Sequence, residues 1–187
     1  NLKIKKNINE NLEKFGLPPL PPYILRNGNE DLNNEKDKNR YQTFFASSPG
    51  AIAAPTAGLH FTPKIFSKIK NLGIEILELT LHVGWGTFSS INVKDIREHK
   101  MHEEFFSICN ENLQKLKYFK KNNKKIFGVG TTSVRVLETL ALHNFEKSSG
   151  HTDIFIHPPY NFSVVDGLLT NFHLPKSSLM LLVSAFC

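Results

Sequence analysis

The stretch Ile126-Phe127-Gly128-Val129-Gly130-Thr131-Thr132-Ser133-Val134-Arg135-Val136-Leu137-Glu138 indicates the fold of the chain. A short apolar run meets two glycines, three hydroxyl residues follow, and apolar positions then recur at helical spacing. Because glycine permits a tight turn and a hydroxyl side chain caps a helix, this order predicts a strand, a turn and a helix. The amino end of such a helix attracts negative charge, and Arg135 adds a forked cationic donor for a carboxylate or phosphate.

This turn has two interpretations, an anion-binding loop and an ordinary strand-to-helix connection with a good cap. Ser133 stands where the dinucleotide-binding fingerprint has its third glycine. The Gly-Lys pair of a Walker-type phosphate loop is absent as well. The motif alone therefore predicts neither of these two nucleotide-binding loops.

Length and composition indicate a globular protein. The chain has 187 residues, of which 40% are hydrophobic and 15 are Phe, enough to bury one substantial core. Its net charge of +6 favours a polyanionic partner. The 2 Cys residues form neither a disulfide framework nor a four-cysteine zinc site. No apolar run approaches the ~20 residues that cross a bilayer, and no signal pattern opens the chain, so we expect a cytoplasmic protein without membrane contact.

The order of the elements predicts an α/β fold. Strands expected near residues 74, 126 and 153 alternate with helices near 63, 111 and 134, which favours a layered domain with a largely parallel sheet. Thr62 and Pro63 should start a helix that runs to Gly73, and Asn110 should cap another. A final helix should begin at Ser177, and residues 40–46 also have helical spacing.

Histidines next to turns are the main candidates for acid–base chemistry. His60, His82, His102, His157 and His173 all flank glycine, proline or polar residues, which is unusual for core histidines. A metal site is not expected, because His99 and His102 lack the pattern and the further ligands that would complete one.

Three further segments bear on function, and the last two of them have two interpretations each. The run 51–61, made largely of small residues and broken by Pro and Gly, favours a close approach of the backbone to another group. Glu103 and Glu104 are either a solvated pair or supply a base beside His102. The lysines of 115–125 are most simply a solvated helix face, with a phosphate contact as the alternative.

Read together, seven blocks resemble the bacterial S-adenosylmethionine:tRNA ribosyltransferase-isomerase (QueA) family. They are, in chain order, residues 19–24, Arg40-Tyr41-Gln42-Thr43, residues 53–61, residues 82–84 with 86–88, Met101-His102, residues 129–135 and residues 170–175. The resemblance implies an enzyme that transfers and isomerises the ribosyl part of S-adenosylmethionine onto the 7-aminomethyl-7-deazaguanine base at the tRNA wobble position. Adenine and methionine leave, and epoxyqueuosine forms.

The resemblance also implies where the site lies. The expected catalytic residues are His60, His82, His102, Glu104 and His173. The expected substrate-binding residues are Arg40, Tyr41, Gln42, Thr56, Gly58, Gly84, Gly86, Thr87, Gly130, Thr131, Thr132, Ser133, Arg135 and Asn171. Neither a metal nor a cofactor is expected, since S-adenosylmethionine is a substrate. The partners would be this molecule and the tRNA, and the protein would be a monomer.

The resemblance further implies a division of the chain. Residues 1–17 would be the tail of a small inserted β-barrel domain, and residues 18–187 an α/β catalytic domain that is incomplete at its C-terminal end. The chain begins at Asn1 and stops at Cys187 inside an apolar segment, which also indicates a fragment. Two alternatives to the enzyme stay open, a noncatalytic tRNA-binding module of the same family and a generic nucleotide-binding α/β enzyme.

Overall fold

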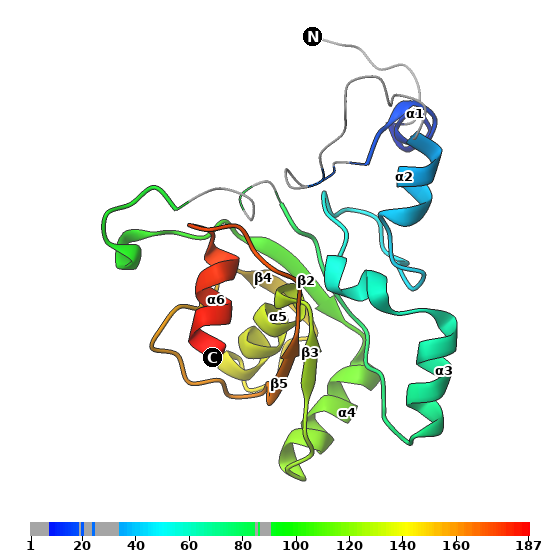
Figure 1. Cartoon of the computed structure of the whole chain (residues 1–187). Coiled ribbons are helices and arrows are strands. Elements are labelled where there is room, and N and C mark those ends of the chain that lie inside the picture. Colours follow the sequence, from blue (N-terminus) through cyan, green and yellow to red (C-terminus); the bar gives the residue numbers. More distant parts are fainter. Residues whose placement is uncertain (1–7, 19, 21–23, 25–33, 85, 87–90) are drawn as a thin grey trace.

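The computed structural model describes residues 8–18, 20, 24, 34–84, 86 and 91–187. Its helices are α1 (Ile8–Phe15), α2 (Asn34–Arg40), α3 (Pro63–Asn71), α4 (Asn110–Lys121), α5 (Thr131–Leu142) and α6 (Ser178–Phe186) (Figure 1). Its strands are β1 (Leu79–Leu81), β2 (Glu104–Ile108), β3 (Phe127–Val129), β4 (Ser149–Thr152) and β5 (Gly167–Leu169). Short 3₁₀ turns lie at Thr56–His60 and Ile96–Glu98.

The described strands form two small sheets. In the first, β2 lies between β1 and β4 and is antiparallel to both, with Leu81 opposite Phe106 and Glu104 opposite Thr152. In the second, β3 and β5 are parallel, with Val129 opposite Leu169. The prediction of a largely parallel sheet is therefore wrong for these strands.

That error has a local cause. β2 was not expected as a strand, yet it is the central strand of the antiparallel sheet. Its side chains alternate between buried and exposed or half-buried, beginning with a buried carboxylate instead of an apolar residue. The strand expected at 153–156 lies four residues earlier, at β4. Of the strand expected over 74–83, only residues 79–81 form a strand, which is β1.

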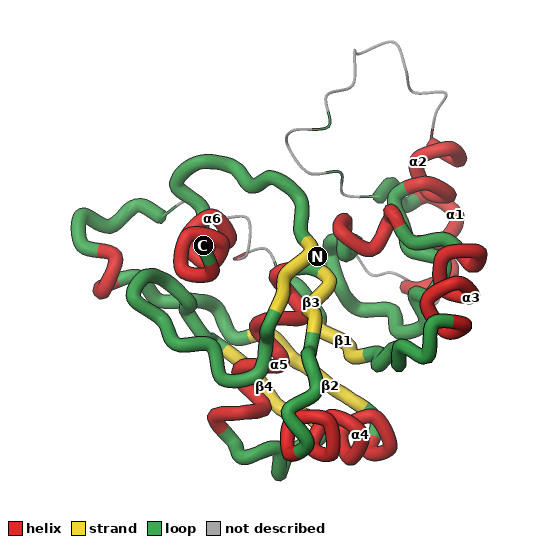
Figure 2. The backbone as a smooth tube through the Cα atoms, turned by 60° about the horizontal axis from the view of Figure 1, so that its bottom comes forward, coloured by secondary structure: helices red, strands yellow, loops and turns green. Residues whose placement is uncertain are grey.

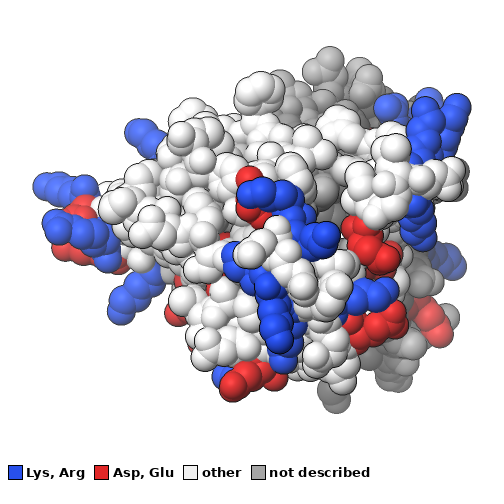
Figure 3. Space-filling model, turned by 90° about the horizontal axis from the view of Figure 1, so that it is seen from below, with Lys and Arg blue, Asp and Glu red and all other residues white. Residues whose placement is uncertain are grey.

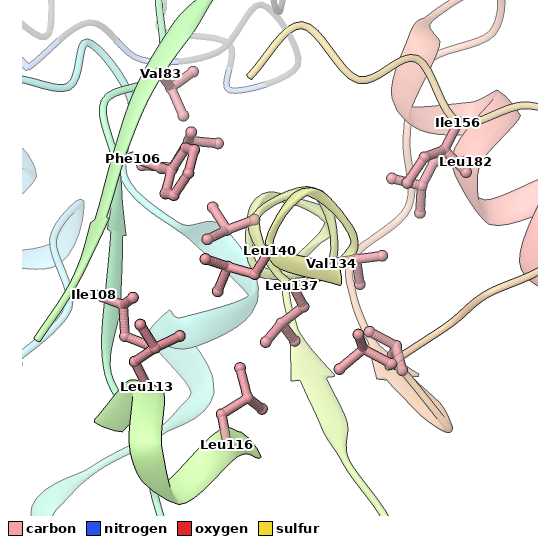
Figure 4. Close-up of a cluster of buried hydrophobic side chains, with 14 residues drawn as sticks. Val83, Phe106, Ile108, Leu113, Leu116, Val134, Leu137, Leu140, Ile156 and Leu182 are labelled. Carbon is pink, nitrogen blue, oxygen red and sulfur yellow. The ribbon is translucent and has the colours of Figure 1, made fainter. Parts of the chain in front are cut away.

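Helix α5 lies between the two sheets (Figures 2 and 4). It contacts β1 and β4 of one sheet, β3 of the other, and α6. Its apolar side chains Val134, Val136 and Leu140 are completely buried. The core around them includes Phe106, Ile108, Leu113, Leu116, Ile156 and Leu182 (Figure 4).

Helix ends follow local capping chemistry. The backbone N–H of Ile65 donates to Oγ1 of Thr62 at 3.3 Å, and Pro63 occupies the first turn, which confirms the predicted start of α3. Ser177, where the final helix was expected to begin, is instead the cap of α6, because its hydroxyl accepts from the N–H of Met180 at 3.2 Å and the helix starts at Ser178. For α4 the predicted cap is wrong by one residue, because Cys109 is the cap and Asn110 the first helical residue.

The described residues of the N-terminal part form helices rather than strands. Residues 8–15 form α1, and no strand occurs between residues 8 and 18, so the remnant of a β-barrel is not confirmed there. Helix α2 precedes most of the segment with helical spacing, because it ends at Arg40 and residues 41–46 form no helix. No helix in the described part of the chain is long and apolar enough to cross a membrane.

Candidate active site

The carboxyl ends of the two parallel strands bring three segments together. The N–H of Gly130 donates to the carbonyl of Leu169 at 2.8 Å, so the start of α5 lies beside the loop that follows β5. Gly130 has a φ of 88°, and a Cβ there would lie 3.9 Å from the Cβ of Ala57 in the Thr56–His60 turn. In α/β folds, ligands collect at such strand ends.

His60 and Asn171 meet at this point although 111 residues separate them in the chain. His60 Nε2 lies 3.3 Å from Asn171 Oδ1. His60 is exposed and Asn171 is half-buried. A histidine held by one hydrogen bond and open to solvent is suited to exchange protons with a bound substrate.

His173 lies two residues further along the same loop. Its Nε2 is 3.0 Å from the hydroxyl of Thr170. Burial lowers the pKa of His173 from its ordinary value of 6.5, because a charged imidazolium is disfavoured away from water. His173 is therefore neutral at pH 7 and has a lone pair that accepts a hydrogen bond or proton.

Few polar side-chain groups in the first turn of α5 are accessible to a ligand. The hydroxyl of Ser133 donates to the carbonyl of Val129 at 2.8 Å, so it stabilises the helix start. Thr131 is buried and Thr132 is half-buried. The hydroxyl residues stand at the amino end of α5, which begins at Thr131, but the prediction that one of them caps the helix is wrong, because the cap is Gly130 and no side chain accepts a capping hydrogen bond.

Arg135 points into the interior and pairs with Glu104. Its Nη1 donates to Oε2 of Glu104, and both side chains are at least 97% buried. The other oxygen of Glu104 accepts from the N–H of Gly84 at 2.8 Å. Arg135 Nε and Nη2 are buried and have no hydrogen-bond partner among the described residues. Three predicted site residues thus form one buried unit linking the end of β1, the start of β2 and α5.

His82 and His102 flank this buried unit. The ring of His82 stacks on Phe105 with centroids 5.7 Å apart, and its Nδ1 is buried without a partner in the described part of the structure. His102 is exposed and lies against Gly86, where a Cβ would come within 1.9 Å of its ring. Gly86 is therefore required for this contact. Thr87 lies outside the described residues.

The block around Tyr41 supports the turn that carries His60. Tyr41 is buried, whereas Arg40 and Gln42 are exposed. A Cβ at Gly58 would lie 2.9 Å from both the ring of Phe45 and the methyl group of Thr43, so Gly58 allows close packing. The half-buried Thr56 begins the same turn.

One buried carboxylate with several hydrogen bonds, Glu138, was missed from sequence. Glu138 accepts backbone hydrogen bonds from Ser163, Val164 and Val165 at 2.8, 2.9 and 3.2 Å. The hydroxyl of Tyr160 also approaches it, at 3.4 Å. Burial, reinforced by the charge of Glu138, raises the pKa of Tyr160 to about 12. The available signal was a single carboxylate among the apolar positions of α5.

Two other expectations concern the surface. No group of three or more His, Cys, Asp or Glu suited to a metal ion occurs among the residues that the structure describes. On the face viewed in Figure 3, basic side chains are interleaved with acidic ones. Lys115 pairs with Glu111 at 3.1 Å and Lys125 with Asp166 at 2.8 Å, which favours the interpretation of the lysine run as a solvated face.

Known proteins with similar sequences agree on one family. All of residues 1–187 match the family described as "Queuosine biosynthesis protein". The S-adenosylmethionine:tRNA ribosyltransferase-isomerase of Sulfurihydrogenibium sp. (strain YO3AOP1) is 56% identical over 181 residues, covering 97% of this chain and 52% of the relative. The enzyme of the same name from Carboxydothermus hydrogenoformans is 51% identical over 178 residues, covering 95% of this chain and 51% of the relative.

A solved structure is similar as well. The crystal structure of S-adenosylmethionine tRNA ribosyltransferase from Thermotoga maritima aligns with a TM-score of 0.54 and 41% identity. The alignment covers 70% of this chain and 40% of that one. This chain spans about half the length of the curated relatives that it matches. With its whole length matched, the chain belongs to the family of queuosine biosynthesis proteins.

Proposed function

We propose that the protein transfers and isomerises the ribosyl part of S-adenosylmethionine onto 7-aminomethyl-7-deazaguanine at the wobble position of tRNA. Adenine and methionine would leave and epoxyqueuosine would form. The observation that carries this proposal is the contact between His60 and Asn171 at the carboxyl ends of β3 and β5. Family membership and the names of the relatives give the reaction class.

The two histidines of this region suit the two proton transfers. Removing a proton next to the sulfonium needs a base, and His173 is supported in that role because burial keeps it neutral. Departure of adenine needs an acid, and the exposed His60 is open to proton exchange with solvent. His82 and His102 remain further candidates, since both lie at the mouth of the loop that contains Gly84 and Gly86.

The remaining residues bind or position the substrates. The amino end of α5 at Thr131, Thr132 and Ser133 suits the carboxylate of the methionine part. Glu104 and Arg135 act as a positioning pair in this proposal, because each already has the other as its partner inside the protein. Arg40, Gln42 and Thr56 would contact substrate from the opposite segment, on the side of Tyr41 and Gly58.

The wider assignments follow from the proposed reaction. The partners are tRNA and S-adenosylmethionine, which is consumed as a substrate, and no cofactor is assigned. We propose a monomer in the cytoplasm, where tRNA modification takes place. Residues 18–187 would be the catalytic domain, and the assignment of residues 1–17 to a separate small domain stays a prediction.

Release of adenine tests the proposal directly. The protein is incubated with S-adenosylmethionine and tRNA that carries the deazaguanine precursor, and free adenine is measured by chromatography. Matched reactions use tRNA with unmodified guanine at the wobble position. Adenine release that depends on the precursor supports the proposal. Binding of the tRNA without adenine release supports the second candidate, a noncatalytic tRNA-binding module.

A further inference from the structure

Phe172 is fully exposed between two residues whose side chains are held in place. Its relative exposure is 102%, the highest among the described large hydrophobic residues. On one side, Asn171 bonds to His60, and on the other, His173 bonds to Thr170. In Figure 1 this segment leaves the end of β5 and crosses to the start of α6. The ring is thus displayed by an anchored loop.

Two other exposed aromatic residues, Phe44 and Phe127, have partners that explain their positions. Phe44 is 48% exposed, but its ring packs edge-on against Phe45 and Phe66, at 5.3 and 4.8 Å. Phe127 is 70% exposed and covers Gly167, where a Cβ would come within 2.3 Å of its ring. Phe172 has no ring contact with any described residue and both of its faces are available.

We propose that Phe172 stacks on an unpaired nucleobase of an RNA loop and holds it beside the His60–Asn171 contact. The inference rests on the proposed function, which supplies the class of ligand. Aromatic side chains bind unpaired bases through their faces, while adjacent polar groups bond to the base edges. Asn171 and His60 are the adjacent polar groups here, and the exposed Lys176 in the same loop provides a charge for the phosphate backbone.

A protein partner fits this surface less well. The two residues next to Phe172 in the chain, Asn171 and His173, are polar and hydrogen-bonded, and neither of the exposed leucines of this segment, Leu169 and Leu174, adjoins it in the chain. The core of a protein interface is more apolar, and a stable one buries about 800 Å² on each side. A projecting ring flanked by base-edge donors and acceptors instead has the features of a single-strand binding site.

The test measures binding of an RNA hairpin that carries 2-aminopurine in its loop. Stacking on Phe172 should quench the fluorescence of this base. Phe172→Ala should remove the quenching and weaken binding by about 5- to 150-fold, the range that follows from loss of one base–aromatic stack. Phe172→Leu keeps an apolar side chain and should behave like the alanine variant, whereas Phe172→Tyr should behave like the original protein. Phe127→Ala is the matched control for removal of an exposed aromatic ring.

Four results would overturn the inference. They are unchanged binding in Phe172→Ala, full binding in Phe172→Leu, an equal loss in Phe127→Ala, and absence of hairpin binding by the original protein. A fifth contradicting result would come from sedimentation. If the original protein is a dimer and Phe172→Ala is a monomer, the ring of Phe172 contacts a second copy of the protein instead of RNA. Adenine release is scored separately, so the reaction can fail while Phe172-dependent stacking holds, and the reverse.

Discussion

Arg135 Nη1 donates to Oε2 of Glu104 inside the protein, and Oε1 of Glu104 accepts from the N–H of Gly84. One carboxylate therefore connects α5, β2 and the segment after β1. Because both charges are out of water, the pair fixes these segments relative to one another, and each charge depends on its partner.

Removing one member of this pair should destabilise the fold strongly. Glu104→Ala leaves the Arg135 guanidinium buried without its carboxylate, and we expect a loss of about 3–5 kcal/mol in the free energy of unfolding. Glu104→Leu combined with Arg135→Met removes both charges and should lose less. Urea unfolding of the single and double variants measures the coupling. Lys115→Ala, which breaks only exposed ion pairs, is the control and should leave the urea midpoint nearly unchanged. Additive effects of the two changes would contradict a coupled pair.

Loss of the His60 imidazole should affect chemistry rather than folding. His60 is exposed, so His60→Ala should unfold at the same urea concentration as the original protein. If His60 transfers a proton, adenine release should fall by about 10²- to 10⁴-fold. His143→Ala, at the end of α5, is the control histidine. A full rate in His60→Ala would assign the proton transfer to another residue.

The lowered pKa of His173 should make the folded protein less stable at acidic pH. Its pKa is lowered in the folded protein, so below the ordinary value of 6.5 the unfolded chain binds a proton that the folded chain does not. The free energy of unfolding should therefore decrease as the pH falls from about 6.5 towards the folded pKa. His173→Gln should remove this part of the pH dependence, as measured by thermal unfolding at a series of pH values. An unchanged dependence in the variant would mean that other groups cause it.

The ionisation of Tyr160 reports on Glu138. The phenol of Tyr160 should lose its proton only near pH 12. The measurement is the difference in ultraviolet absorbance between the original protein and Tyr160→Phe over a pH titration. Glu138→Gln removes a negative charge and should lower this pKa, although burial should keep it above the ordinary 10.0. The same variant should also weaken the hydrogen bonds that the backbone N–H groups of residues 163–165 donate to the Glu138 side chain. No change in the titration would show that burial alone raises the pKa.

Features determined by a few neighbouring residues could be predicted from sequence. The start of α3 is one example, because Thr62 and Pro63 specify it through a cap and a fixed φ. The turn at Gly130 is another, since its φ of 88° requires glycine. The mixed α/β character followed from the same local signals.

Features that depend on distant pairing could not be predicted. Glu103 and Glu104 are adjacent and chemically alike, yet only Glu104 is buried, because alternation along β2 turns it inward. The meeting of His60 with Asn171 depends on the parallel pairing of β3 and β5. The interior position of Arg135 depends in turn on the unexpected strand β2, which supplies its carboxylate.

The position of α5 between two separate sheets also determines how the protein should unfold. Helix α5 contacts strands of both sheets, so the loss of either sheet exposes its buried side chains Val134, Val136 and Leu140. Each sheet is too small to survive that exposure alone. Unfolding should therefore be one cooperative event, and the amide hydrogens of α5 should exchange with deuterium only as fast as the whole unit opens.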